Sequence, residues 1–306
     1  MAWDRAVRLP PDTLESLAGR HGGTVLAGPL LAPTRLRPPD FAESGDLAPL
    51  LVPRFVSRAR AAAERGAVIL ARTDLAPSLA GAAGLWAHEH PAWVLAGLLD
   101  TSLAPPDPAV VGPNCDIAAT AFLGPRVEIG ARVRIGPGAV IGYPGFGWAS
   151  GPSGSVRALP QLAGVVIEDD VSIGPLCTID AGTLVPTRVG RDAKLDAHVH
   201  VGHNVDIGAG TIIAAQCGFA GSVTIGEGVL IGGQVGVADH VTVGAGARIA
   251  AKSGVISDVP AGATVAGYPA VPRGRWLRAL AKLYRSLGAA GQIAPAGEAT
   301  SVNRTG

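Results

Sequence analysis

An aliphatic residue recurs every sixth position between Val111 and Val255, and this repeat restricts the possible folds more than any other feature of the sequence. It runs in three blocks, from Val111 to Ile141, from Ile167 to Ile179 and from Val189 to Val255. A period of six matches neither an α-helix, which repeats about every 3.6 residues, nor a long strand, which alternates about every two. It matches a strand of about four or five residues followed by a tight turn, repeated many times.

Three such strands and turns make one triangular coil, and stacked coils bury a continuous column of aliphatic side chains. Glycine directly follows many of the recurring residues, as in Ile129-Gly130 and Ile225-Gly226. We expect these glycines to supply the unusual backbone angles that tight turns need. A narrow column leaves little room for large rings, in keeping with an aromatic content of 4%.

Two interruptions break the repeat. The first, residues 142–166, is rich in Gly, Ser and Pro and is expected to leave the coil as a loop. The second is a four-residue excess around Thr183-Leu184-Val185-Pro186. Loops that leave a rigid scaffold often carry binding or catalytic residues, although an insertion can also be tolerated without a function.

The flanking sequence lacks the repeat and divides the chain into three parts. Residues 1–108 are expected to form a small α/β domain, residues 109–272 the β-helix, and residues 273–306 a helix followed by a disordered tail. The Pro-rich stretch Ala104–Pro108 is interpreted as a stiff linker. The elements expected outside the repeat are helices over Leu14–Ala18, Phe55–Arg65, Trp93–Leu99 and Trp276–Leu287, and a strand over Ala67–Leu70.

Composition excludes several classes of protein. The 25 Lys and Arg residues balance 24 Asp and Glu residues, whereas a nucleic-acid-binding domain is usually strongly basic. Cys115, Cys177 and Cys217 form no CxxC pair and are interpreted as reduced thiols rather than as a disulfide or zinc framework. The N-terminus has no apolar signal-peptide core, and no apolar run is long enough for a transmembrane segment. We therefore expect a cytoplasmic protein.

The histidines of the repeat allow three hypotheses. His203 lies at a turn, and His240 lies two coils and one residue further along, so an imidazole base for acyl transfer is the first hypothesis. A zinc site is the second, because His198 and His203 have the five-residue separation of β-helical carbonic anhydrases, but no third histidine lies two coils earlier. The third hypothesis is a scaffold without catalytic activity.

Six motifs in the repeat region occur in the order typical of one family. They are Gly145-Phe146-Gly147-Trp148-Ala149, Pro160-Gln161, Thr178-Ile179-Asp180-Ala181-Gly182, His203-Asn204, Ala220-Gly221-Ser222 and His240. With these motifs the chain resembles the UDP-3-O-(3-hydroxyacyl)glucosamine N-acyltransferases of lipid A biosynthesis. The resemblance departs from the family at Ala181, where Arg is usual, and in a β-helix that is about three coils shorter before the first interruption.

The resemblance implies a left-handed parallel β-helix, a homotrimer, and transfer of a 3-hydroxyacyl chain from acyl carrier protein to the 2-amino group of a UDP-linked glucosamine. His203 would be the general base, with His240, Asp196, Asn204 and Gly221 contacting the substrate. The acyl chain would arrive on the carrier's phosphopantetheine, so that neither a metal nor a resident cofactor is expected.

The N-terminal domain would hold the uridine. At the matching positions this chain has Pro49, Val52 and Phe55, and the Phe55 ring is the group expected to stack on the base. An acyltransferase acting on a different amino- or hydroxy-sugar is the alternative. The basic residues of the last helix are expected to receive the acidic carrier protein. They are Arg273, Arg275, Arg278, Lys282 and Arg285.

Overall fold

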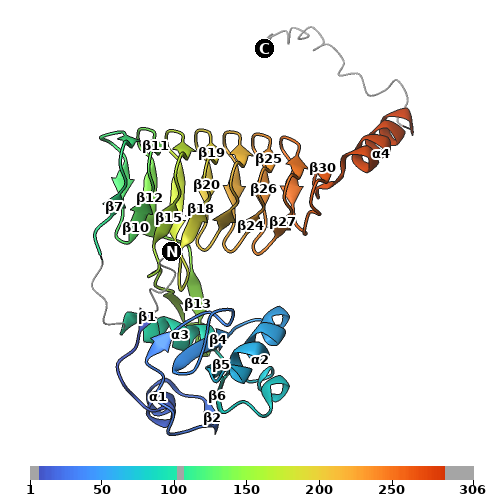
Figure 1. The fold of residues 1–306 in the computed structure, drawn as a ribbon. Helices are drawn as coiled ribbons and strands as arrows, with labels where there is room; N and C mark the ends of the chain where they lie inside the picture. The colour runs from blue at the N-terminus through green and yellow to red at the C-terminus, as the bar shows by residue number, and fades with distance from the viewer. Residues whose placement is uncertain (1–6, 102–106, 287–306) are drawn as a thin grey trace, which may run out of the picture.

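The computed structural model describes residues 7–101 and 107–286, and within them it shows a stack of triangular coils with a small α/β unit beside it (Figure 1). The expected linker falls largely, and the expected disordered tail wholly, outside the described residues. The repeat therefore folds as a parallel β-helix, as predicted from its period of six.

Each side of the stack is one sheet, and we name the three sheets after their first strands. Consecutive strands of a sheet pair in parallel, one coil apart, as in Ile207 with Ile225 and Ile225 with Val243. The β7 sheet consists of β7 (Val110–Val111), β10 (Val127–Ile129), β15 (Val165–Ile167), β18 (Thr187–Val189), β21 (Asp206–Ile207), β24 (Thr224–Ile225) and β27 (Thr242–Val243).

The β8 sheet consists of β8 (Asp116–Ile117), β11 (Arg134–Ile135), β16 (Ser172–Ile173), β19 (Lys194–Leu195), β22 (Ile212–Ile213), β25 (Leu230–Ile231), β28 (Arg248–Ile249), β30 (Thr264–Ala266) and the antiparallel β31 (Val271–Pro272). The β9 sheet consists of β9 (Phe122–Leu123), β12 (Val140–Pro144), β17 (Thr178–Ala181), β20 (His200–Val201), β23 (Gly218–Phe219), β26 (Gly236–Val237) and β29 (Gly254–Val255). Most of these strands have two or three residues, fewer than the four or five expected, because the corners take up the rest of each hexad.

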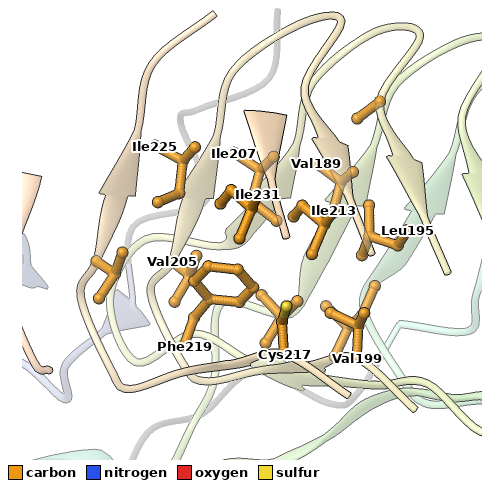
Figure 2. Packing of buried hydrophobic residues seen from close by; sticks show 14 of the residues in the cluster. Val189, Leu195, Val199, Val205, Ile207, Ile213, Cys217, Phe219, Ile225 and Ile231 are labelled. Carbon is orange, nitrogen blue, oxygen red and sulfur yellow. The ribbon is translucent and has the colours of Figure 1, made fainter. Parts of the chain in front are cut away.

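The recurring aliphatic residues point into the stack and form one continuous core (Figure 2). Ile207, Ile213 and Phe219 are almost completely buried and come from three different sheets of one coil. Phe219 is the one aromatic ring among the buried residues of this cluster. At the first coil the rule weakens: Val111 is 45% exposed, because no earlier coil covers it.

The glycines that follow the aliphatic residues have a different role from the expected one. At Gly190, directly after Val189, a Cβ atom would lie 2.7 Å from the backbone nitrogen of Ala209 in the next coil. Positive φ angles occur instead two residues further along most hexads, as at Asn204 (59°) and His240 (57°). Glycine after the aliphatic residue thus allows coils to approach closely, whereas the left-handed corner residue makes the turn.

The N-terminal unit is a six-stranded sheet with helices on both faces. Its strand order is β1-β3-β4-β5-β6-β2, and the middle strands β3 to β6 are parallel. Leucines of α1 and α3 cover one face, and alanines of α2 with Leu79 cover the other. The elements are β1 (Val7–Arg8), α1 (Leu14–His21), β2 (Thr24–Ala27), β3 (Arg35–Leu36), β4 (Asp46–Leu50), η1 (Pro53–Phe55), α2 (Val56–Glu64), β5 (Val68–Arg72), η2 (Ala76–Leu79), β6 (Gly84–His88) and α3 (Pro91–Asp100).

The first interruption is a β-hairpin rather than an irregular loop. Strands β13 (Trp148–Ser150) and β14 (Val156–Ala158) pair antiparallel, with η3 (Pro152–Gly154) between them. The hairpin packs on α3, where the Arg157 guanidinium stacks 4.1 Å from the centre of the Trp93 ring. The hairpin therefore links the β-helix to the N-terminal unit (Figure 1).

The described chain ends in the helix α4 (Arg273–Ser286), which begins three residues earlier than expected. It contacts β30 and β31, and the Trp276 ring packs against the backbone of Gly267. All three cysteines are free, with Cys177 and Cys217 buried in the core. Among the described residues, no helix combines the length and the apolar character that a membrane span requires.

Candidate active site

A groove of about 770 Å³ runs along the outer surface of the β9 sheet. Its lining includes Asp180, His203 and His240, together with Phe146 from the start of the first interruption and Tyr268 after the last coil. The floor consists largely of glycine and alanine, so that the polar side chains stand beside an open stretch of backbone. The groove thus brings together the two histidines that the sequence singled out.

His203 lies at a corner after β20, between two glycines. A Cβ atom on Gly145 would lie 2.7 Å from the Cβ atom of His203, and one on Gly221 would lie 2.6 Å from His203 Nε2. His203 Nδ1 is 3.1 Å from Asn204 Oδ1. Gly145 therefore lies against the Cβ atom of His203 and Gly221 against its ring, and one ring nitrogen is hydrogen-bonded.

Asn204 lies beside His203 rather than on the open groove. The nitrogen and the oxygen of its side-chain amide both form hydrogen bonds with other residues of the chain. Its Nδ2 group donates to the Val185 carbonyl (2.7 Å), and its Oδ1 atom accepts from the Thr183 backbone N–H (3.3 Å). The Thr183 hydroxyl lies 2.9 Å from the same Oδ1 and 2.7 Å from Gln161 Oε1. The second interruption thus supplies the groups that surround Asn204.

Asp180 is a further site residue that the sequence did not identify as one, although it belongs to the Thr178-Ile179-Asp180 motif. Its side chain is 14% exposed, and its carboxylate lies 3.9 Å from His200 Nε2. His200 Nδ1 in turn lies 2.7 Å from the Thr178 hydroxyl. Burial raises the pKa of the Asp180 carboxyl, while the imidazoles of His200 and His203 lower it. One largely buried carboxylate therefore lies beside the His200 imidazole and interacts electrostatically with that of His203.

His240 stands two coils beyond His203, as the spacing predicts, through the corner contacts of Ser222 with His203 and of His240 with Gly221. Its ring centre is 5.9 Å from that of Phe55 in the N-terminal unit. The guanidinium carbons of Arg54 and Arg58 lie 4.9 and 5.0 Å from the centre of the Phe55 ring. Burial and the nearby Arg54 cation lower the pKa of His240. The N-terminal unit thus brings an aromatic ring and two cations to the second histidine.

The structure does not bring every selected residue into the groove. Asp196 is exposed at a different corner, where its carboxylate accepts from the Ala197 N–H, and it does not line the groove. His198 occupies that same corner, so the two histidines of the zinc hypothesis lie at different corners of the coil. In residues 7–101 and 107–286 no group of three or more potential ligands is arranged to hold a metal ion.

The fold and site define a parallel β-helix of hexapeptide repeats with an imidazole-lined groove. A family model described as bacterial transferase hexapeptide (six repeats) matches residues 186–221, which include His203 and Gly221. Together with the stacked parallel sheets, this match supports the left-handed β-helix expected from the resemblance.

Similar proteins of known name indicate which kind of hexapeptide-repeat transferase this chain resembles. The chain is 52% identical over 182 residues to the UDP-3-O-acylglucosamine N-acyltransferase of Anaeromyxobacter dehalogenans (strain 2CP-C), covering 58% of this chain and 51% of the relative. It is 54% identical over 154 residues to the protein of that name from Caulobacter vibrioides (strain NA1000 / CB15N), covering 50% and 45%. The resemblance inferred from the motifs is thereby confirmed, and the chain spans about half the length of the curated relatives it matches.

Among solved structures, the Francisella novicida UDP-N-acetylglucosamine acyltransferase aligns with a TM-score of 0.49 and 28% identity, covering 56% of this chain and 63% of that chain.

Proposed function

We propose that this protein is an N-acyltransferase that moves a 3-hydroxyacyl chain from acyl carrier protein to the 2-amino group of UDP-3-O-acylglucosamine. The observation that carries the proposal is the His203 imidazole in a groove, in a chain about half identical to N-acyltransferases over the matched length. Neutral imidazole is suited to taking a proton near pH 7.

In this mechanism the amine nitrogen attacks the thioester carbonyl while His203 Nε2 takes the amine proton. A C–N bond forms, and the carbonyl oxygen becomes an oxyanion. The tetrahedral intermediate then collapses and the C–S bond breaks, so that the phosphopantetheine sulfur leaves and receives the proton from His203. The products are an amide and a thiol, and no metal or redox group takes part.

Two further groups stabilise charge during this reaction. Asp180 stabilises the imidazolium that forms on His203, because the two groups interact electrostatically and a nearby carboxylate lowers the energy of a cation. Gly221 lies beside the His203 ring, and its backbone N–H is the proposed donor to the oxyanion. His240, with its lowered pKa, is a neutral hydrogen-bonding partner for the substrate.

The decisive experiment replaces the base. We expect His203→Ala to lower kcat by about 10²- to 10⁴-fold, the usual loss for a general base, while the circular dichroism spectrum stays unchanged. The matched control is His198→Asn, at the neighbouring corner and outside the groove, where Asn tolerates the positive φ angle. Near-normal activity of His203→Ala would refute the assignment of the base.

A homotrimer is part of the proposal. Closed cyclic assemblies are common, and Phe146, which is 85% exposed on the rim of the groove, is available to meet a neighbouring subunit. Sedimentation at micromolar concentration should give a mass three times that of the chain. A fully active monomer would show that the active site lies within one subunit.

The second candidate function is acyl transfer to a different amino sugar. What favours it is the Phe55 ring, which has Arg54 and Arg58 within cation–π distance where a uracil would have to stack. A screen of carrier-protein thioesters against UDP-glucosamine derivatives and other amino-sugar nucleotides separates the two candidates by their kcat/KM values.

A further inference from the structure

The four extra residues at 183–186 contact Asn204, and Asn204 in turn contacts His203. Thr183 and Val185 both reach the amide of Asn204, whose backbone turns the corner with a φ angle of 59°. Gly182 precedes them, and a Cβ atom there would collide with the Val185 carbonyl oxygen. The excess is therefore folded tightly back onto the corner that carries the base.

Backbone groups fix which way the Asn204 amide faces. The Val185 carbonyl can only accept, so the atom 2.7 Å from it must be the Nδ2 donor. The Thr183 N–H can only donate, so the atom facing it must be the Oδ1 acceptor. An amide whose two ends face groups of fixed character has one satisfactory orientation.

That orientation decides the tautomer of His203. Asn204 Oδ1 lies 3.1 Å from His203 Nδ1, and an amide oxygen cannot donate a proton. Nδ1 must therefore carry the hydrogen in the neutral ring, which leaves the lone pair on Nε2. Nε2 is the nitrogen beside Gly221, at the groove.

We propose that the second interruption is a tautomer clamp: Asn204, held by the backbone of Thr183 and Val185, keeps neutral His203 in the Nδ1–H form, with Nε2 free to act as a base. Asn204 is thus a positioning residue that acts through His203. The inference deepens the proposed acyl transfer and rests on it for its catalytic meaning, but the tautomer itself does not depend on any substrate.

Gln161 supports the clamp from the first interruption. Its Nε2 group donates to the Leu159 carbonyl, so Oε1 is the acceptor that faces the Thr183 hydroxyl at 2.7 Å. Both side chains are 8% exposed. A buried network with every member bonded holds its geometry, because breaking one bond leaves a costly unpaired group.

Side-chain ¹⁵N chemical shifts report the tautomer directly. In protein labelled with ¹⁵N-histidine, at a pH where imidazoles are neutral, the His203 signal should show the Nδ1–H form; a His203→Gln spectrum assigns that signal. In Asn204→Gly the His203 signal should show a mixture of tautomers. The kcat value should fall at least tenfold, toward the ~10⁴-fold loss that a wrong tautomer brings in serine proteases, with KM for the acyl donor little changed.

Asn114→Gly is the matched control. Asn114 has the same corner conformation (φ 58°), is exposed and lies far from the groove, so this variant has the same Asn-to-Gly backbone change. It should alter neither the His203 signal nor kcat.

A wild-type His203 with its proton on Nε2, or an unchanged tautomer in Asn204→Gly, would overturn the clamp. An Nδ1–H signal in a protein that transfers no acyl group would instead refute the proposed function and leave the clamp intact.

Discussion

His203 has room for its ring because residue 221 carries no side chain. A Cβ atom at Gly221 would lie 2.6 Å from both Cε1 and Nε2 of His203, closer than such atoms approach. The φ angle of Gly221 is not positive, so an alanine there is strained by the ring and not by the backbone.

We therefore predict that Gly221→Ala folds but displaces the imidazole and lowers kcat by about 10²-fold, the effect of moving a catalytic group by about 1 Å. Steady-state kinetics would measure this loss. Gly233→Ala is the control, because Gly233 holds the same place in its hexad and its nearest neighbour would be 3.3 Å away. Equal kcat values for the two variants would show that the His203 ring can shift without loss of activity.

The sequence predicts part of this site and not the rest, for a physical reason. The hexad count places His203 and His240 two coils apart at the same corner of the β-helix, because the period fixes where each residue stacks. The count cannot follow the chain through an insertion, so the contacts of Thr183 and Val185 with Asn204 were unpredictable. Asp180 was present in a recognised motif, but its burial beside two imidazoles depends on how β17 and β20 pair.

At the scale of elements, the helix α4 presents one strongly basic surface. Arg275 and Arg278 are exposed and lie on the helix that follows the last coil, a few residues after Tyr268, which lines the groove. If the acidic carrier protein docks here, its attraction acts mainly on association and weakens with salt.

The double variant Arg275→Glu/Arg278→Glu should raise KM for the acyl-carrier thioester several-fold, leave KM for the sugar nucleotide unchanged and reduce the salt dependence. Arg275 lies in the first turn of the helix, where negative charge favours helix formation, so α4 should persist. An equal change in both KM values would place the carrier elsewhere.

The two strands of the hairpin β13–β14 could not be predicted from the sequence. Its residues are rich in Gly, Ser and Pro, which favour a loop, and its strands have three residues each. What stabilises them is tertiary: Trp93 of α3 packs against Gly151 and under the Arg157 guanidinium. A contact between segments more than fifty residues apart leaves no local pattern, whereas the helices around Leu17, Ala59 and Leu95 show their apolar faces in the sequence.

On the scale of the whole molecule, the hairpin and the Phe55–His240 contact join the N-terminal unit to the β-helix. Partly buried imidazoles lie on both sides of this junction. Burial lowers the pKa of His21 and of His88 in the N-terminal unit, and of His240 on the β-helix. His88 Nδ1 also accepts from the His90 backbone N–H (2.8 Å), a bond that a protonated ring cannot accept.

These shifts predict that acid destabilises the protein in a defined window. A histidine whose pKa is lower in the folded protein than its unfolded value of about 6.5 binds fewer protons when folded. Stability therefore rises with pH through this range, and its contribution is lost as pH falls below about 6.5. We expect the midpoint temperature of thermal unfolding to decrease as the pH is lowered from about 7.5 to about 5.5. This range lies above the one in which carboxylates usually titrate. The His88→Gln variant, whose amide oxygen can still accept from His90, should show a shallower fall in calorimetry. A thermal midpoint that is constant or rises on acidification would show that these imidazoles become protonated in the folded protein as readily as in the unfolded chain.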